Sequence, residues 1–459
     1  MSSRKGAIGE ALVYGLEDVP RPFPRAVVFG LQHVLTMFGA TVAVPLLMAP
    51  AMKMSAAETA TLVSACMLAA GLSTLCQVNF GSRLPIIQGT SFSFIGPMLA
   101  IIAATGATAA SMQSIQGAIL AGSVVEFVVG ATGLIGMLRR VVTPVVIGPV
   151  IALIGLGLFE VGAPQAGQNW LLSGMFIVLT FAFALGGDRR RVTVFKLLPV
   201  LLAMTITYCI AMVLSLAGVF KPGMPGYVDF GAVISAPWFR FNLVFPWGPP
   251  KFNLAFFLAI LAAYVSSMIE SFGDYHSISS VVGLEDPSAR TISRGIAAEG
   301  VGCFLAGLVG AFANTSYTEN IGLVGLTRVA SRYVVNVAAV LLIVLGVASK
   351  FGAIVATIPS PIVGGMYCTL FGLIAAVGLS NLMRADMTSQ RNLMIVGFSM
   401  FMGLSLPVYL KASPVRIESA QWVADVINTV GQTRMAVAAI IGMVLDNLIP
   451  GTDQERGIA

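Results

Sequence analysis

The chain has 459 residues, of which 57% are hydrophobic and only 10% are charged. Because soluble domains carry roughly 25% charged residues, this composition excludes an ordinary soluble domain and indicates a membrane protein with many spans. The net charge of +6 does not indicate a nucleic-acid partner, since the basic residues are spread along the chain instead of forming one patch.

The sequence lacks motifs for catalysis and for metal or nucleotide binding. Its two histidines and five scattered cysteines, none in a Cys-x-x-Cys pair, predict neither a metal site nor a disulfide framework. It carries no hydrolase motif and no phosphate-binding glycine-rich loop. We therefore expect no cofactor and no enzyme activity, and an ion gradient rather than ATP as the driving force for any transport.

Apolar runs of roughly 20 residues recur along the whole chain, which is the length that a helix needs to cross a hydrocarbon core of about 30 Å. They predict about fourteen membrane spans, two of them short and broken. The candidate spans are 25–49, 57–78, 84–106, 113–136, 141–162, 170–186, 195–219, 253–282, 291–312, 315–331, 333–349, 359–379, 391–406 and 432–449.

Basic residues predict the orientation of these spans. If the N-terminus is inside, the inner loops carry most of the arginines and the outer loops carry few basic residues, as the positive-inside rule requires. The arginines of the predicted inner loops are Arg83, Arg139, Arg140, Arg189, Arg190, Arg191, Arg290, Arg294, Arg328, Arg332, Arg384 and Arg391. We therefore expect a protein of the cell membrane with both termini in the cytoplasm and two long outer loops, 220–252 and 407–431.

Two pairs of segments repeat at a distance of seven predicted spans. Residues 90–96 (TSFSFIG) resemble 315–322 (TSYTENIG), and residues 144–156 resemble 361–373 in the spacing of proline and glycine. Because seven is odd, equivalent spans would cross the membrane in opposite directions, as in the inverted repeats of alternating-access transporters. We predict that spans three and ten are each broken into a short strand and a half-helix, with Ser316 to Ile321 extended and a helix opening at Gly322.

A few ionisable side chains fall inside predicted spans, where a charge is costly and usually functional. They are His33, Glu126, Glu160, Glu270, Asp274, His276, Glu299, Glu319 and Asp446.

Glu270 and Asp274 are four residues apart and share a helix face, so they repel unless one holds a proton or meets a partner. This pattern suits proton coupling, and the alternative is a buried network that locks helices together. His33 is either a buried histidine bonded to a neighbour or part of a proton relay. We interpret Glu126, Glu160 and Glu299 as structural, because each is isolated or near the end of a span.

Four motifs occur in the order in which one transporter family carries them. Residues 319–328 (ENIGLVGLTR) resemble the signature of the nucleobase–ascorbate transporter family, also called nucleobase–cation symporter family 2. Residues 32–33 (QH) resemble its Gln-His pair, residues 270–274 (ESFGD) its acidic motif in span eight, and residues 88–92 (QGTSF) its broken third span. The resemblance extends over residues 20–450.

The resemblance implies an all-α polytopic membrane fold with fourteen spans in a 7+7 inverted repeat. Spans 1–4 and 8–11 would form a core domain, and spans 5–7 and 12–14 a gate domain. The implied parts are a cytoplasmic tail (1–24), core segments (25–136 and 253–349), gate segments (137–219 and 350–449), an extracellular loop (220–252) and a second cytoplasmic tail (450–459).

The same resemblance implies a homodimer in the lipid bilayer that moves a nucleobase together with a proton, whereas mammalian ascorbate members use sodium. The base would be bound by carboxylates, by backbone groups of the broken spans and by one small residue, namely Glu270, Glu319, Phe92, Thr318 and Ala40. The residues implied to couple the proton or to support the site are His33, Asp274, Asn320, Gln32 and Thr327.

The expected substrate depends on Glu319. Uracil-type members usually carry Glu at this position and purine-type members Gln, which favours uracil. Asp274 and residues 88–91 are more similar to purine members, so a permease for xanthine, urate or another purine is the alternative. Ascorbate members carry Pro in place of Glu319, which disfavours ascorbate.

Two other classes of protein compete with this interpretation. Families of anion transporters share the inverted-seven architecture, but Glu270 and Glu319 would repel an anion. A receptor or scaffold that transports nothing would gain no stability from two broken spans.

Overall fold

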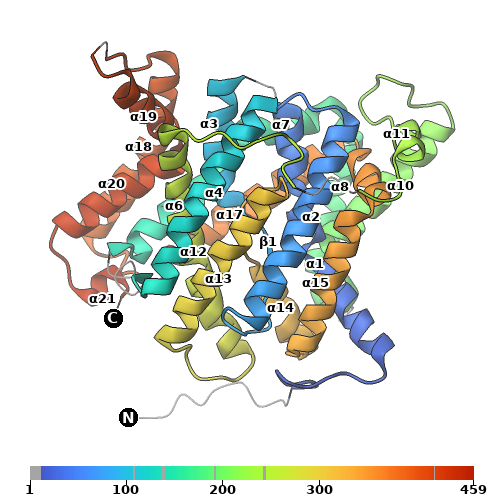
Figure 1. The fold of residues 1–459 in the computed structure, drawn as a ribbon, viewed down its shortest axis with the longest axis horizontal. Helices are drawn as coiled ribbons and strands as arrows, with labels where there is room; N and C mark the ends of the chain where they lie inside the picture. The colour runs from blue at the N-terminus through green and yellow to red at the C-terminus, as the bar shows by residue number, and fades with distance from the viewer. Residues whose placement is uncertain are drawn as a thin grey trace.

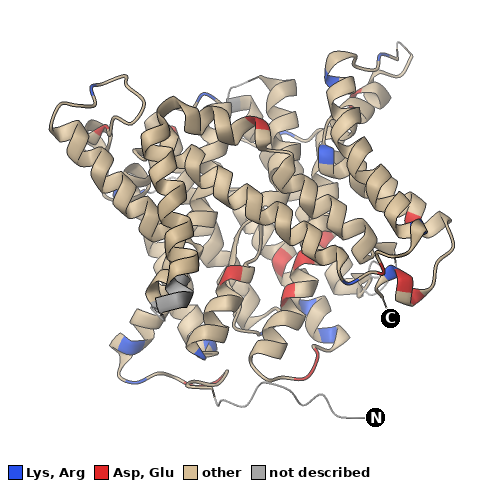
Figure 2. Cartoon of the chain, turned by 180° about the vertical axis from the view of Figure 1, so that it is seen from behind, with Lys and Arg blue, Asp and Glu red and all other residues tan. Residues whose placement is uncertain are grey.

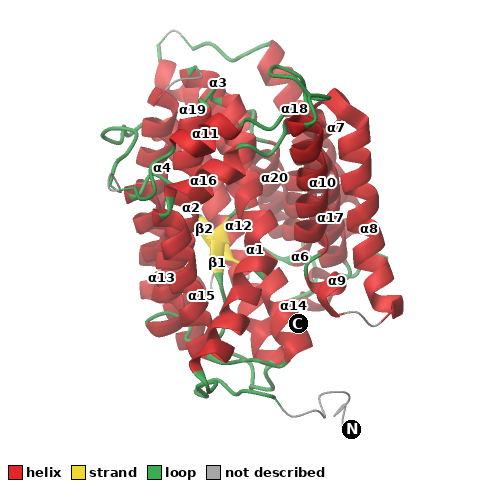
Figure 3. Ribbon diagram, turned by 90° about the vertical axis from the view of Figure 1, so that its right-hand side faces the viewer, coloured by secondary structure: helices red, strands yellow, loops and turns green. Residues whose placement is uncertain are grey.

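The computed structural model describes residues 12–106, 109–135, 141–190, 193–240, 244–417 and 419–458. Arg139, Arg140 and Arg191 of the predicted inner loops, and residues 1–11 of the predicted N-terminal tail, lie outside this part of the chain. The described chain is almost entirely helical, and two short strands lie at the centre of the helices (Figure 1 and Figure 3).

The first half of the chain places strand β1 after two long helices. Its elements are α1 (Phe23–Ala51), α2 (Ala56–Asn79), β1 (Gln88–Thr90), the 3-10 turn η1 (Phe92–Phe94), α3 (Ile95–Thr105), α4 (Ala109–Thr132), α6 (Pro144–Leu156), α7 (Phe159–Ala166), the 3-10 turn η2 (Gly167–Asn169), α8 (Trp170–Arg190), α9 (Thr193–Leu197) and α10 (Pro199–Leu216).

The second half repeats this order, with strand β2 again after two long helices, which follow the short helix α11. Its elements are α11 (Phe230–Ser235), α12 (Leu254–Val281), α13 (Ala289–Leu308), β2 (Asn314–Ser316), α14 (Thr318–Thr327), α15 (Arg332–Val347), α16 (Ser349–Ala356), α17 (Ser360–Leu382), α18 (Gln390–Ala412), α19 (Gln421–Gly431), α20 (Arg434–Leu448) and α21 (Asp453–Arg456).

Long apolar helices account for most of the predicted spans. Among the described residues, eight stretches are helical, long and apolar enough to cross a membrane, and a ninth joins α19 and α20 across a bend of 95°. One of the eight, Pro144–Gly186, covers the two predicted spans 141–162 and 170–186. The predicted broken spans contribute only the shorter helices α3 and α14, so the count of fourteen spans stays a prediction.

The two broken segments pair with each other. β1 and β2 form an antiparallel two-stranded sheet in which Gln88, Gly89 and Thr90 face Ser316, Thr315 and Asn314. This confirms a strand followed by a half-helix in each repeat. The pairing satisfies backbone groups that lipid could not satisfy at this depth.

The predicted start of the second half-helix was wrong. α14 begins at Thr318 instead of Gly322, so Glu319 lies in its first turn rather than on an extended segment. Tyr317 lies between β2 and α14, and its hydroxyl donates to the Thr90 carbonyl at 2.9 Å. A helix that begins directly after it also places an acid in the first turn, where the helix dipole stabilises negative charge.

The second outer loop was also predicted too long. Within 407–431, α18 continues to Ala412 through Pro407, and residues Gln421–Gly431 form α19. Proline is tolerated inside such helices where neighbouring groups satisfy the freed carbonyl. Most of the first long loop, 220–252, is irregular as expected, apart from α11, and its Trp247 indole donates to the Gly310 carbonyl at 2.9 Å.

Helix contacts divide the described helices into two groups. One group, around the strands, consists of α1, α2, α4, α12, α13 and α15, and the other consists of α6, α7, α8, α10, α17, α18 and α20. The prolines of the second sequence repeat, Pro144 and Pro361, open α6 and α17, which pack on each other. α16 packs against α2 and therefore lies with the first group.

Gly89→Ala tests the close approach at the paired strands. A Cβ on Gly89 would lie 2.6 Å from Cζ of the Tyr317 ring, so the ring must move and the strand pair must open. We expect a loss of about 1–3 kcal/mol in stability, seen as a lower melting midpoint of the purified protein. The control is Gly96→Ala in α3, where the nearest atom to an added Cβ is 3.7 Å away. Equal midpoints for the two variants would contradict this close approach of the strands.

Candidate functional site

A cavity of about 370 Å³ lies between the two helix groups. One wall is polar and comes from α12, η1, β2 and the start of α14. The opposite wall comes from α6 and α17 and is mostly apolar, apart from Asn381 near the end of α17 and Arg384 just after it. The polar wall includes Ser91, Phe92, Ser93, Glu270, Asp274, Thr315, Ser316, Tyr317, Thr318 and Glu319. The apolar wall includes Ile147, Ile151, Ile154, Leu373, Ile374 and Val377. Such a volume and such a mixture of walls are typical of small-molecule sites.

Asp274 is held by the second broken segment. Its carboxylate accepts hydrogen bonds from Ser316 Oγ at 2.7 Å and from Thr318 Oγ1 at 2.9 Å. These donors belong to the end of β2 and the start of α14, so the bonds tie α12 to the point where strand becomes helix. Asp274 is 5% exposed, and its two partners occupy its carboxylate oxygens.

Glu270 and Glu319 lie in the polar wall without a side-chain partner among the described residues. Glu270 lies one helical turn before Asp274 on α12, and Glu319 lies in the first turn of α14. Both line the cavity, and among the described residues neither carboxyl accepts a side-chain hydrogen bond. Figure 2 shows that acidic positions gather inside the helical body, whereas many lysines and arginines lie near helix ends.

Two helix starts face the same cavity. Ser91 caps η1 by accepting from the Ser93 amide at 3.3 Å, and Tyr317 precedes the first turn of α14. The first amides of a helix have no partner within the helix, so they can donate to carbonyl groups of a ligand. The cavity therefore offers carboxylate acceptors and backbone donors side by side.

His33 and Asn320 connect α1 to α14 behind the cavity. Asn320 Nδ2 lies 3.1 Å from His33 Nδ1 and donates to the His33 carbonyl at 3.0 Å. Both residues are buried, and neither lines the cavity. The structure thus brings together these two residues, which the resemblance implies to couple the proton or to support the site.

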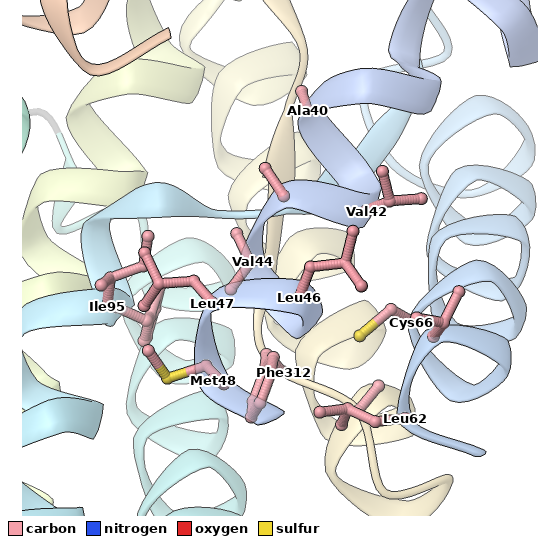
Figure 4. Packing of buried hydrophobic residues seen from close by; sticks show 14 of the residues in the cluster. Ala40, Val42, Val44, Leu46, Leu47, Met48, Leu62, Cys66, Ile95 and Phe312 are labelled. Atoms are coloured by element: carbon pink, nitrogen blue, oxygen red, sulfur yellow. The ribbon is translucent and has the colours of Figure 1, made fainter. Parts of the chain in front are cut away.

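Three other predicted residues lie away from the cavity. Ala40 is buried in the apolar cluster around α1, near Val42 (Figure 4). The half-buried Gln32 precedes His33, and its carbonyl accepts from Thr36 Oγ1. Thr327 Oγ1 donates to the Leu323 carbonyl in the last turn of α14.

The sequence did not single out the apolar wall. Residues such as Ile151 and Leu373 look like ordinary lipid-facing or core positions in a helix of a membrane protein. The signal that could have found them is the second repeat, because its prolines open the two helices that carry this wall.

A second cavity of about 360 Å³ lies on the other side of Phe92. Phe92 and Ile154 line both cavities, so these two side chains lie between them. The Phe92 ring also contacts Phe371 edge-on, with centroids 6.3 Å apart. In the second cavity Arg434 forms an ion pair with Glu160 at 2.8 Å. Among the described residues, no group of three or more His, Cys, Asp or Glu side chains is arranged to hold a metal ion.

The sequence matches known membrane transport proteins over nearly its full length. The xanthine/uracil permease model, described as Permease family, matches residues 24–412. Solute carrier family 23 member 2 of Rattus norvegicus is 37% identical over 493 aligned positions, which cover 97% of this chain and 76% of the relative. Nucleobase-ascorbate transporter 1 of Arabidopsis thaliana is 35% identical over 97% of this chain and 91% of the relative. The chain belongs to the nucleobase–ascorbate transporter family.

Membership in the nucleobase–ascorbate transporter family makes the chain a membrane transport protein and confirms the resemblance of its four motifs. Solved structures show the same fold at low identity. The transmembrane domain of the cyanobacterial bicarbonate transporter BicA superposes with a TM-score of 0.56 at 12% identity, covering 94% of this chain and 98% of that one. The murine Solute Carrier 26 family member A9 anion transporter gives a TM-score of 0.59 at 10% identity, covering 94% and 69%.

Ser316→Ala tests how the broken segment is held. The variant removes the donor to Asp274 Oδ2 and the contact of 2.9 Å to Ser271 Oγ, and leaves a buried carboxylate under-satisfied. We expect a loss of about 1–3 kcal/mol in stability, measured as a lower melting midpoint. The control is Ser277→Ala, which also lines the cavity but bonds only the Gly273 carbonyl of its own helix. A midpoint for Ser316→Ala equal to that of this control would show that the network does not stabilise the site.

Proposed function

We propose that the chain is a proton-coupled nucleobase symporter that imports uracil or a related base across the cell membrane by alternating access. The observation that carries the proposal is the pair of carboxyls, Glu270 and Glu319, that line the cavity and accept no side-chain hydrogen bond from the described residues. The name of the Arabidopsis relative, a nucleobase-ascorbate transporter, supports the same substrate class.

The polar wall is complementary to the edge of a nucleobase. A uracil or xanthine ring presents adjacent N–H and C=O groups, so carboxylates can accept from its N–H groups while helix-start amides donate to its carbonyls. Bonds to a charged acceptor are roughly twice as strong as neutral ones. The flat faces of the ring would lie against apolar side chains such as Phe92 and Ile151. A solute without the N–H groups would leave a buried carboxylate unpaired, which gives selectivity.

Uracil is the preferred substrate in this proposal, and xanthine, urate or another purine is the alternative. Glu319 favours uracil through the family resemblance, whereas Asp274 resembles the purine members. An anion is disfavoured, because three acids, Glu270, Asp274 and Glu319, line the cavity, and Arg384 is the one cation among the described lining residues. The fold shared with bicarbonate and anion transporters therefore does not decide the substrate.

The helix groups support a core domain and a gate domain. The group around the strands carries the carboxyls, and the other group carries the apolar wall. Phe92 and Ile154 lie between the cavity that holds the carboxyls and the second cavity. A small movement of one helix group against the other would therefore connect the two cavities or separate them, which would change the side from which the base can enter. We place both termini in the cytoplasm and expect two copies to form a homodimer.

Glu319→Gln and Glu270→Gln test the substrate contacts. Each variant keeps the shape of the side chain but replaces a charged acceptor by an amide, so we expect at least a tenfold weaker uracil affinity, or ~1.4 kcal/mol. The measurement is the rise in melting midpoint with uracil, thymine, xanthine, urate, guanine, hypoxanthine or ascorbate, because a ligand that binds the folded state raises the midpoint. The control is Glu160→Gln, which lies in the second cavity. Unchanged affinity for every base in both variants would contradict the assignment.

Asp274→Asn tests proton coupling. The amide oxygen can accept from one of the two hydroxyls, Ser316 or Thr318, and the amide nitrogen can donate to the other, but the amide carries no titratable proton. We expect the variant to bind the base and to lose accumulation driven by an inward proton gradient in proteoliposomes. Accumulation at the wild-type level would show that Asp274 does not carry the coupled proton. If accumulation by the wild type depended on sodium and not on pH, the coupling ion would be sodium instead of a proton.

A further inference from the structure

Two acids of the interior lie outside the cavity. Glu126 on α4 and Glu299 on α13 are 0% and 1% exposed, and neither lines the cavity. Nothing in the sequence indicates that they belong together, because they are far apart in the chain and each is isolated among apolar residues. In the structure they are neighbours, and one of them is linked to the cavity by hydrogen bonds.

Close packing of α4 against α13 brings the two carboxyls together. A Cβ on Gly300 would lie 2.6 Å from the backbone N of Phe127, and a Cβ on Gly130 would lie 2.2 Å from the backbone N of Ala297. Glu126 precedes Phe127 and Glu299 precedes Gly300, so both acids lie at the same level of this interface. Their charges repel each other there.

The two carboxyls have unequal surroundings. Glu299 accepts from Ser267 Oγ at 2.9 Å and from Ser271 Oγ at 2.5 Å, and the Tyr275 hydroxyl lies 3.4 Å away. Neither oxygen of Glu126 accepts a hydrogen bond from a described N–H or O–H group. Donors stabilise a carboxylate at Glu299. At Glu126 the neighbouring donor is the Cys303 thiol, which is a weak one, so a buried carboxylate there is far costlier than a neutral acid.

No described base offsets the second negative charge. The titratable groups that act on the pair are Cys303 on α13 and Tyr264, Glu270, Asp274 and Tyr275 on α12. α3 and β2 carry no titratable residue, and α2 carries Cys66, Cys76 and, in its first turn, Glu58. In such surroundings ionising the second of two adjacent buried carboxylates costs far more than ionising the first, so the resting pair binds one proton.

An unbroken chain of hydroxyl groups leads from this pair to the cavity. Ser271 Oγ lies 2.5 Å from Glu299 Oε2 and 2.9 Å from Ser316 Oγ, and Ser316 Oγ donates to Asp274 Oδ2 at 2.7 Å. Hydroxyl groups both donate and accept, so such a chain can pass a proton. It ends at the carboxyl to which we assign proton coupling.

We propose that Glu126 and Glu299 form a second proton-binding site outside the cavity, in which Glu126 holds the proton beside an ionised Glu299 and which exchanges it with Asp274 through Ser271 and Ser316. In one transfer Glu126 gives its proton to Glu299, each hydroxyl releases a hydrogen as it accepts another, and Asp274 ends protonated. The pair is then doubly ionised, a high-energy state that lasts only until a proton returns along the same chain. The role of this proton in transport rests on the proposed function, whereas the binding of the proton does not.

Infrared difference spectroscopy of the purified full chain tests the site without any base. Spectra at a series of pH values record the C=O band of protonated carboxyls. Glu126→Gln should remove one component of this band, and Glu299→Gln should move the midpoint of that component about one pH unit or more toward acid, because the like charge is gone. Glu160→Gln, which changes an exposed acid, is the control and should leave the band unchanged.

Three results would overturn the site. They are an unchanged band in Glu126→Gln, an unmoved midpoint in Glu299→Gln, and a midpoint that follows sodium concentration at fixed pH, which would indicate a metal-cation site instead. Should a glutamine variant not fold, Ser271→Ala keeps both acids and must keep the Glu126 component.

The link to transport has its own readout. Ser271→Ala should bind uracil or xanthine as the wild type does. The number of protons that the protein takes up or releases per bound base should fall by at least half. Calorimetry in buffers of different ionisation enthalpy measures this number. An unchanged proton count would overturn the link. If the wild type binds no base while the Glu126 component is present, the proposed function fails and the proton site stands.

Discussion

Backbone N–H and C=O groups at the depth of a membrane need partners inside the protein, because lipid provides none. The two broken segments of this chain satisfy each other, with Thr90 opposite Asn314 at one end of the β1–β2 pair. Tyr317 closes the pair, since its hydroxyl donates to the Thr90 carbonyl and its ring lies against Gly89. Once the strands are paired, the helices that follow both begin at the cavity. The positions of the acceptors and donors in the site all depend on this pairing.

The buried acids differ in what their carboxyl groups contact. Asp274 is bonded to the broken segment, which positions that segment and keeps Asp274 next to it. Glu270 and Glu319 have no such partner among the described side chains and remain available to a ligand. Asp446, by contrast, is fixed by ion pairs with Arg391 at 2.9 Å and Arg456 at 2.8 Å, so it stabilises the end of the chain. Position in a span alone does not distinguish these roles, but hydrogen-bond partners do.

The sequence predicted the parts of the fold that periodicity and motifs encode. The two broken spans followed from the repeat, and the shared face of Glu270 and Asp274 followed from their spacing. The start of α14 at Thr318 could not be predicted, because it depends on where Tyr317 contacts β1. The proximity of Glu126 to residues of α13 was equally invisible, since it arises from glycines at a helix interface and not from any local pattern.

The most direct test of the account is a cryo-electron microscopy structure of the purified protein with uracil or xanthine bound. We predict density for the base in the cavity beside Phe92, with Glu270 and Glu319 oxygens at hydrogen-bond distance, roughly 2.7–3.2 Å, from ring nitrogens. Density in the second cavity near Arg434, or a base that contacts neither carboxyl, would contradict the central claim that the paired broken segments build a nucleobase site.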